Sequence, residues 1–272
     1  MNALKDWLET RRTRLTWLDC DRYVWSVFAG APERWYSDPG TMIGAIAQAH
    51  KLLRSDVLTV DLQGAFSRHL SSAGTAAEIV DALEGEEPRR DLSSAVDALA
   101  HQFAGSVDLV LDCPSPRRLF PPGADADLDD LDDVASALLD VVRSLADRPL
   151  AGLQITCDTA PGPDEDEADS WSSLLSAARH YGWVTVIRLN ALTDPEQLDP
   201  GWPGDLVLLP RLDAEAVPDD VRHGAGLPPE AWADSPDAVR TVDAAAKRGF
   251  RFGEIPGDAS PEIVLDRIRA LS

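Results

Sequence analysis

Short apolar runs alternate with longer amphipathic stretches along almost the whole chain. Runs such as Val107–Asp112 and Val184–Leu189 have the length of strands and are apolar at nearly every position, which is typical of strands buried on both faces. Stretches with helical spacing of apolar residues follow most of them. The predicted strands are Tyr23–Phe28, Val57–Asp61, Val107–Asp112, Gly152–Cys157, Val184–Leu189, Asp205–Leu209, Val221–Ala225 and Gly249–Gly253.

Helices are predicted ahead of the first strand and between most of the others. Residues 235–237 and 260–262 each read serine, proline and an acidic residue, which supplies a capping hydroxyl, a proline at the first helical position and a first-turn carboxylate. The predicted helices are Ala3–Arg14, Thr41–Arg54, Thr75–Glu84, Leu92–Phe103, Asp130–Asp147, Ser170–Tyr181, Ala231–Arg248 and Pro261–Leu271.

Strands that alternate with helices favour right-handed crossovers and a parallel sheet of the α/β class. Eight such units in 272 residues predict a (β/α)8 TIM barrel with an N-terminal helix, and an open doubly wound sheet is the alternative. The polar stretches are short enough to be loops, and no internal repeat is visible. We therefore expect one domain over residues 1–272.

The composition describes an acidic protein, with 47 Asp and Glu against 25 Lys and Arg and a formal net charge of −22. Nucleic acid and anionic membrane are not expected as partners, because both need clustered basic residues. The charged N-terminus and the absence of a long apolar window predict a cytoplasmic protein. Cys20, Cys113 and Cys157 form no recognisable pair, so three reduced thiols are expected.

In such a barrel the active site lies at the carboxyl ends of the strands, where several polar residues are predicted. Carboxylates crowded there would have pKa values pushed apart, which suits one as an acid and another as a base. We expect Arg188 to bind a substrate carboxylate or to pair with Asp158. Trp25 lies in an aromatic cluster that could floor a pocket. The predicted strand-end residues are Asp61, Asp112, Cys113, Asp158, Arg188, Asn190, Arg211, His223 and Glu254.

Two acidic or thiol patterns suggest metal chemistry. Residues 129–133 match the DDxxD motif of terpene synthases, but the second motif of those enzymes overlaps it on the same helix, and their fold is all helical. The run is therefore interpreted as an acidic first turn that the helix dipole favours. A metal-dependent enzyme that uses Asp112, Asp158 and Cys157 stays open as an alternative.

The chain resembles the uroporphyrinogen decarboxylase-like superfamily, which also contains cobalamin- and zinc-linked methyltransferases. The resemblance rests on segments along nearly the whole chain: Asp21-Arg22-Tyr23-Val24-Trp25, Asp38-Pro39-Gly40-Thr41-Met42, residues 55–62, residues 249–256 and residues 260–264. It implies a barrel enzyme in which Asp61 matches the catalytic aspartate of the decarboxylases.

Several positions depart from the family pattern. Val27 and Ala31 stand where the decarboxylases have arginines, and Glu254 stands where the last strand of the family offers a histidine. The His-x-Cys pair of the methyltransferases is missing from residues 186–190. Uroporphyrinogen itself and zinc-thiolate methyl transfer are therefore disfavoured.

The resulting hypothesis is a small-molecule lyase or decarboxylase-like enzyme of specialised biosynthesis that works without metal or cofactor. Asp61 and Glu254 would transfer protons. An anionic substrate is expected, because Arg188, Arg211 and Arg117 are predicted to gather on the rim; a homodimer is left open. The remaining predicted substrate-binding residues are Asn190, Asp158, Asp112, His223 and Trp25. The alternatives are a catalytically silent barrel that binds a partner or ligand, and a metal-dependent methyltransferase-like enzyme.

Overall fold

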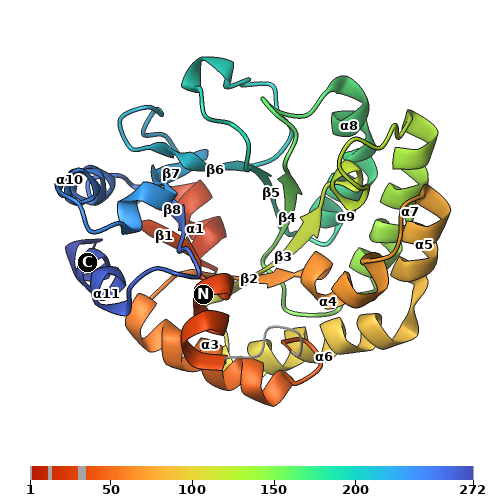
Figure 1. Cartoon of the computed structure of the whole chain (residues 1–272), viewed down its shortest axis with the longest axis horizontal. Coiled ribbons are helices and arrows are strands. Elements are labelled where there is room, and N and C mark those ends of the chain that lie inside the picture. Colours follow the sequence, from red (N-terminus) through yellow and green to blue (C-terminus); the bar gives the residue numbers. More distant parts are fainter. Residues whose placement is uncertain (1, 12–13, 30–34, 272) are drawn as a thin grey trace.

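The computed structural model describes residues 2–11, 14–29 and 35–271, and within them eight parallel strands form a ring (Figure 1). Each strand from β2 to β7 pairs with the next along the chain, and β8 also pairs with β1. The predicted (β/α)8 barrel is therefore confirmed. The strands are β1 (Leu15–Asp19), β2 (Val57–Asp61), β3 (Asp108–Pro114), β4 (Gly152–Cys157), β5 (Val184–Leu189), β6 (Leu206–Asp213), β7 (His223–Leu227) and β8 (Phe250–Glu254).

Side chains complete the ring between β1 and β2, where a regular ladder is replaced by individual hydrogen bonds. The N–H of Thr16 donates to the Asp56 carboxylate at 2.8 Å, and the N–H of Leu18 donates to the Ser55 hydroxyl at 3.0 Å. Asp56 in turn donates its own N–H to the Thr16 carbonyl at 2.8 Å. The barrel is thus nearly closed, and these hydrogen bonds satisfy the backbone N–H groups of Thr16, Leu18 and Asp56 at the seam.

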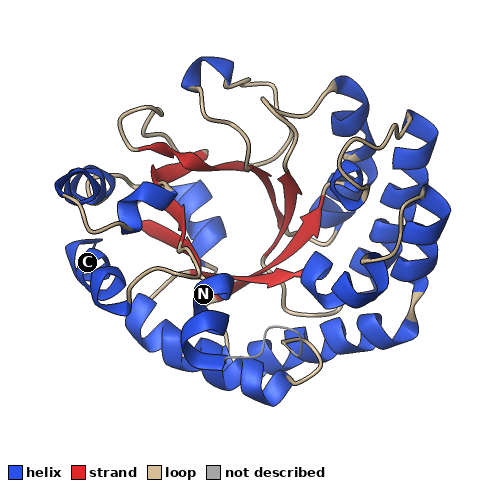
Figure 2. Ribbon diagram, in the orientation of Figure 1, coloured by secondary structure: helices blue, strands red, loops and turns tan. Residues whose placement is uncertain are grey.

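Helices surround most of the strand ring (Figure 2). The 3-10 turn Pro195–Gln197 takes the place of a helix between β5 and β6, and no helix is described between β6 and β7. The 3-10 turn Pro229–Trp232 precedes the helix between β7 and β8. None of the described helices is long and apolar enough to cross a membrane. The helices are α1 (Ala3–Thr10), α2 (Asp21–Val24), α3 (Pro39–Leu53), α4 (Leu62–Leu70), α5 (Ala76–Glu84), α6 (Glu86–Phe103), α7 (Leu128–Ser144), α8 (Glu165–Ser170), α9 (Ser172–His180), α10 (Pro236–Ala245) and α11 (Pro261–Leu271).

The N-terminal helix α1 closes the amino end of the barrel. Leu4 and Trp7 are buried in one cluster with the first inward-facing residues of the strands, among them Leu15 and Phe250. The indole N–H of Trp7 donates to the Val221 carbonyl at 2.9 Å. The interior is therefore solid at this end, and any opening lies at the carboxyl ends.

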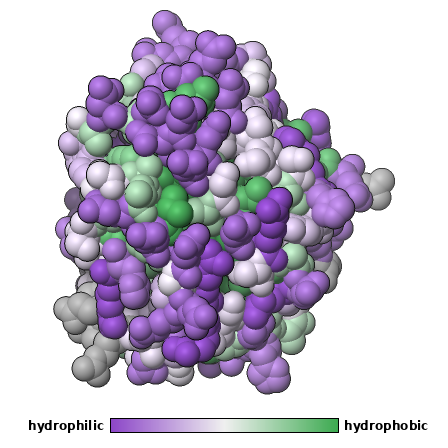
Figure 3. All heavy atoms as spheres, turned by 90° about the vertical axis from the view of Figure 1, so that its right-hand side faces the viewer, coloured by the Kyte–Doolittle hydropathy of each residue, from purple (hydrophilic) through white to green (hydrophobic). Residues whose placement is uncertain are grey.

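The outer surface is largely hydrophilic, as the side of the molecule that carries α5 and α7 shows (Figure 3). The acidic residues 129–133 lie in the first turns of α7, where the Asp127 side chain accepts the N–H of Asp130 as an N-cap. This placement agrees with the interpretation of the run as a helix start that the dipole favours.

The first strand lies earlier in the chain than predicted. The run Tyr23–Phe28 is not a strand: it forms α2 and a π-helical turn, Trp25–Ala29, while β1 is Leu15–Asp19. Tyr23 and Val24 are buried, whereas the next residues turn outward, which is the pattern of a helix rather than of an alternating strand. The predicted first helix correspondingly ends at Thr10 instead of Arg14.

Smaller differences concern other boundaries. Strand β7 is His223–Leu227 rather than Val221–Ala225, so it begins two residues later. Helix α4 follows β2 directly and was not predicted. Helix α8 occupies part of residues 161–169, one of the polar stretches that were expected to be loops.

Candidate functional site

A cavity of about 660 Å³ opens at the carboxyl ends of the strands. This volume suits a small organic molecule. Its charged lining residues comprise seven carboxylates and four arginines. They are Asp19, Asp21, Asp61, Asp112, Asp158, Glu254 and Asp258, together with Arg22, Arg118, Arg188 and Arg211.

Strand alternation places the deepest of these groups in one layer. Since successive side chains on a strand point to opposite faces, the last inward-facing residue of each strand meets its neighbours around the ring. Asp61 of β2 is in register with Asp112 of β3, and Asp19 of β1 is in register with Glu254 of β8. Carboxylates on four adjacent strands therefore face the cavity together.

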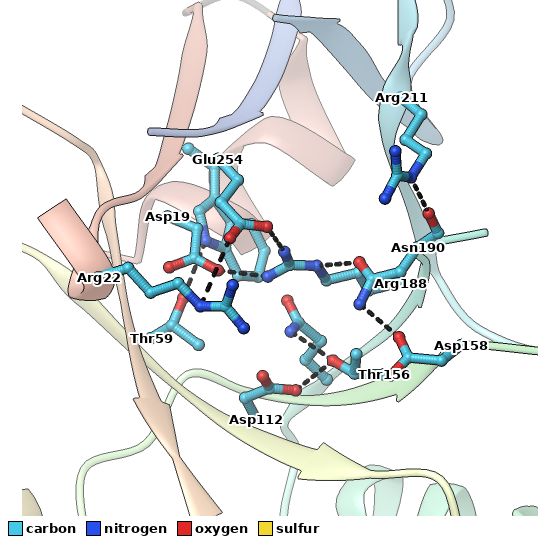
Figure 4. A network of polar contacts seen from close by, with 12 residues as sticks. Asp19, Arg22, Thr59, Asp112, Thr156, Asp158, Arg188, Asn190, Arg211 and Glu254 are labelled. Atoms are coloured by element: carbon cyan, nitrogen blue, oxygen red, sulfur yellow. Dashed lines mark hydrogen bonds and ion pairs between the residues drawn. The ribbon is translucent and has the colours of Figure 1, made fainter. Parts of the chain in front are cut away.

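Arg188 of β5 reaches across the barrel to two of them (Figure 4). Its guanidinium is bound by Asp19, by Glu254 at 2.5 Å and by the side-chain oxygen of Asn190 at 2.7 Å. It also lies 5.4 Å from the ring centre of Phe252 below it. Burial alone would lower the pKa of Arg188, but the nearby carboxylates outweigh this and raise it. Arg188 is therefore a permanently charged group held by three protein partners.

Asp61 and Asp112 form a pair of like charges on neighbouring strands. Burial and the charge of Asp112 raise the pKa of Asp61 to about 6, although the N–H of Gly64 and the guanidinium of Arg118 lower it. A Cβ at Gly64 would lie 2.6 Å from an Asp61 carboxylate oxygen, so only glycine allows this close approach. Burial likewise raises the pKa of Asp112, which accepts a hydrogen bond from Thr156.

Asp21 adds a third carboxylate to this pair from the first turn of α2. Burial raises its pKa well above the usual range, and the charges of Asp19, Asp61 and Asp112 raise it further. Within the described part of the chain, neither Asp21 nor Asp61 nor Asp112 has an ion pair with an arginine or lysine. This trio, Asp21, Asp61 and Asp112, is called the acidic trio below.

The opposite rim is held by a chain of polar contacts. Arg118 binds Asp158 at 2.8 Å, and the amide of Asn190 donates to Asp158 at 2.7 Å. Arg211 donates to the Asn190 carbonyl at 2.7 Å. Arg22, whose side chain is 70% exposed, lies 3.9 Å from Glu254.

Most of the predicted site residues come together at the cavity. Arg188 pairs with Asp19 and Glu254 rather than with Asp158, which takes Arg118 instead. The predicted residues that line the cavity are Asp61, Glu254, Arg188, Asn190, Asp158, Asp112, Arg211 and Trp25.

Two predicted rim residues lie elsewhere. His223 does not line this cavity: it begins β7 at the amino end of the barrel, where its ring nitrogen is 2.8 Å from Asp220. Arg117 points away from the cavity to Asp164 and the buried Glu167. Of the three arginines that were expected to gather on the rim, Arg188 and Arg211 line the cavity and Arg117 does not, and carboxylates outnumber arginines along the described lining.

Asp19, Asp21 and Arg118 were not predicted as site residues. Asp19 has the same signal as Asp61, a carboxylate directly after a short apolar strand, but the misplaced first strand concealed it. Arg118 follows β3 in a 3-10 turn, Pro116–Leu119, and no strand-end pattern marks it.

The proposed metal ligands do not converge. Cys157 belongs to the core between strands and helices, and its sulfur lies 3.6 Å from Glu167 rather than in the cavity with Asp112 and Asp158. Burial raises the pKa of Cys157 to about 12 and raises that of Cys113 as well. No group of three or more potential metal ligands is arranged around one point in the described residues.

Comparisons with known proteins identify the fold. No family model matches the chain, and no curated protein matches it. The homocysteine methyltransferase MmuM from Escherichia coli, in its apo form, is 12% identical with a TM-score of 0.53, over 97% of this chain and 98% of that one. The GH36 α-galactosidase AgaB from Geobacillus stearothermophilus is 13% identical with a TM-score of 0.54, over 100% of this chain and 42% of that one. The chain is thus similar in fold to (β/α)8 barrel enzymes.

Proposed function

We propose that the chain is a divergent member of the uroporphyrinogen decarboxylase-like superfamily, a lyase that transfers a proton to a small polar substrate. The observation that carries the proposal is the register-adjacent pair of Asp61 and Asp112 in a polar cavity at the carboxyl ends of the strands. A cavity with convergent polar groups also favours an enzyme over a catalytically silent barrel.

Asp61 is the proposed proton donor. A carboxyl whose pKa is about 6 carries a transferable proton close to neutral pH, which general acid catalysis requires. In a decarboxylation the bond between the substrate carbon and its carboxylate breaks and leaves the electron pair on carbon. Asp61 gives its proton to that carbon, carbon dioxide departs, and Asp61 regains a proton from water.

Asp112 is the proposed partner of Asp61, ahead of Glu254. Its negative charge helps to keep the proton on Asp61 until transfer. Glu254 is engaged by Arg188 and lies near Arg22, which suits an electrostatic role at the cavity wall.

Replacement of Asp61 tests the proposal. Purified protein would be incubated in D₂O with a panel of small carboxylic and amino acids, and deuterium incorporation and carbon dioxide release would be followed by NMR. Asp61→Asn should lower the rate about 100-fold or more, since it removes the acid. The matched control is Asp258→Asn, an exposed carboxylate at the same mouth.

The pH profile gives a second readout. Because Asp61 acts as the protonated form, kcat/KM of the wild type should fall as pH rises through about 6. Asp112→Asn should move this fall to lower pH, since the neighbouring charge that raises the pKa is gone. Full activity of Asp61→Asn, or unfolding of that variant, would contradict the assignment of Asp61.

A further inference from the structure

We propose that the substrate of this site carries a positively charged nitrogen, an ammonium or amidinium group, which binds among the acidic trio. The inference rests on the proposed function in that it names the substrate class of the same cavity. It replaces an anion as the expected substrate with a cation or a zwitterion.

The arginines of the cavity are already occupied. Arg188 is held by Asp19 and Glu254, and Arg118 is held by Asp158. The acidic trio has no such partner, although its members come from β2, β3 and the start of α2 and face one cavity. Arg118 and Arg188 lower the pKa values of the trio through space, but neither forms an ion pair with a carboxylate of the trio.

Like charges on neighbouring strands, such as those of Asp61 and Asp112, are costly where water is partly excluded. They can be relieved either by protons or by a bound cation. A substrate ammonium bound among the trio would offset the charges of Asp21 and Asp112 and donate up to three N–H hydrogen bonds to carboxylate oxygens.

An organic cation fits better than a metal ion. The cavity measures about 660 Å³, far more than one ion needs, and the described residues contain no cluster of ligands arranged for a metal. Trp25 also lines the cavity, with its ring centre 6.0 Å from that of Trp35. An aromatic face beside carboxylates is suited to an alkylammonium group.

Binding of a cation should expel protons. Burial and mutual repulsion raise the pKa values of Asp21, Asp61 and Asp112, so part of the trio is protonated near pH 6 when no ligand is bound. A positive charge lowers those pKa values. An amine should therefore displace protons from Asp21 and Asp112, whereas Asp61 keeps the proton that it transfers, and the affinity for the amine should rise with pH.

Three probes with the same cyclohexyl ring test the proposal: cyclohexylamine, cyclohexanecarboxylate and cyclohexanol. Dissociation constants would be measured by NMR titration at pH values of about 6 and about 8, and proton release by pH-stat. We expect cyclohexylamine to bind about tenfold more tightly than either other probe. Its affinity should rise from the lower to the higher pH.

Paired variants separate the trio from the overall charge. Asp61→Asn with Asp112→Asn should weaken cyclohexylamine about tenfold. Asp132→Asn with Asp133→Asn on exposed positions of α7 removes the same charge and should leave binding unchanged. Thermal unfolding of both double variants shows whether each is folded.

The outcomes are distinguishable from those of the catalytic test. Tighter binding of cyclohexanecarboxylate or cyclohexanol, or an equal loss of amine affinity in both double variants, would overturn the cationic substrate while Asp61 could still be catalytic. Amine binding that depends on the trio, together with full activity of Asp61→Asn, would support the substrate class and overturn the proposed acid.

Discussion

A buried guanidinium such as that of Arg188 is tolerated because Asp19 and Glu254 lie directly opposite it. Arg188 is only 4% exposed, and the two carboxylates stabilise its charge in place of the solvating water. The reverse also holds: the carboxylates depend on Arg188. Removal of one partner leaves the others uncompensated in a poorly solvated place.

Arg188→Met should therefore be strongly destabilising. The free energy of unfolding, measured by urea denaturation, should fall by about 3–5 kcal/mol, the usual loss when a buried ion pair is broken. Because methionine is of similar size, the loss reflects charge rather than a cavity. Adding Asp19→Asn and Glu254→Gln to Arg188→Met should recover part of the stability. A loss below about 1 kcal/mol would show that the ion pairs are well solvated.

At the level of elements, α1 acts as the floor of the barrel. Its residues Leu4 and Trp7 cover the interior ends of the strands, and the backbone N–H of Leu4 donates to Asp108 at 2.8 Å. The layer formed by Trp17 and Phe252, whose ring centres are 6.0 Å apart, lies between this floor and the Arg188 layer. The floor and the cavity are thus separated by a packed layer.

Trp7→Ala should lower the free energy of unfolding by about 3–5 kcal/mol, because a large buried ring is lost and the site can collapse only partly. Trp7→Phe should cost less, because it keeps most of the buried ring, although it loses the hydrogen bond to the Val221 carbonyl. Probe binding at the carboxyl-end cavity should be unchanged in Trp7→Phe. Chemical denaturation and the NMR titration measure the two effects, and impaired probe binding would show that the floor and the cavity are coupled.

The sequence was sufficient to predict the bounds of an element where that element has a strong local signal. The bounds of β4, β5 and α11 agree with the prediction, since continuous apolar runs or a serine-proline start mark them. Strand β7, HGAGL, is rich in glycine and lacks the side chains that define a register. The prediction therefore shifted it by two residues and displaced His223.

The same reasoning explains the site. Asp61, Asp112 and Glu254 follow apolar strands, so their meeting at one rim could be predicted from topology alone. The partners of Arg188 could not be predicted, because Asp19 depends on the true position of β1 and because a salt bridge across a barrel leaves no trace in local spacing.

For the whole molecule, the net charge of −22 predicts that salt stabilises the fold. Repulsion between surface carboxylates weakens the compact state, and ions screen it over a Debye length of about 10 Å at 0.1 M. Raising sodium chloride from about 0.01 M to about 0.2 M should raise Tm by about 2–4 °C. Differential scanning calorimetry measures this, and a flat or falling Tm would contradict the repulsion argument.

Closure of the amino end by α1 determines how ligands reach and leave the cavity. In the described part of the chain the packed interior closes the amino end of the barrel, and the cavity opens at the carboxyl ends of the strands. Ligands therefore enter and leave the cavity by the same side. A bound product would exclude the next substrate molecule until the product dissociates. In the proposed lyase, substrate and product would therefore use the same mouth, and compounds that resemble the product should inhibit competitively.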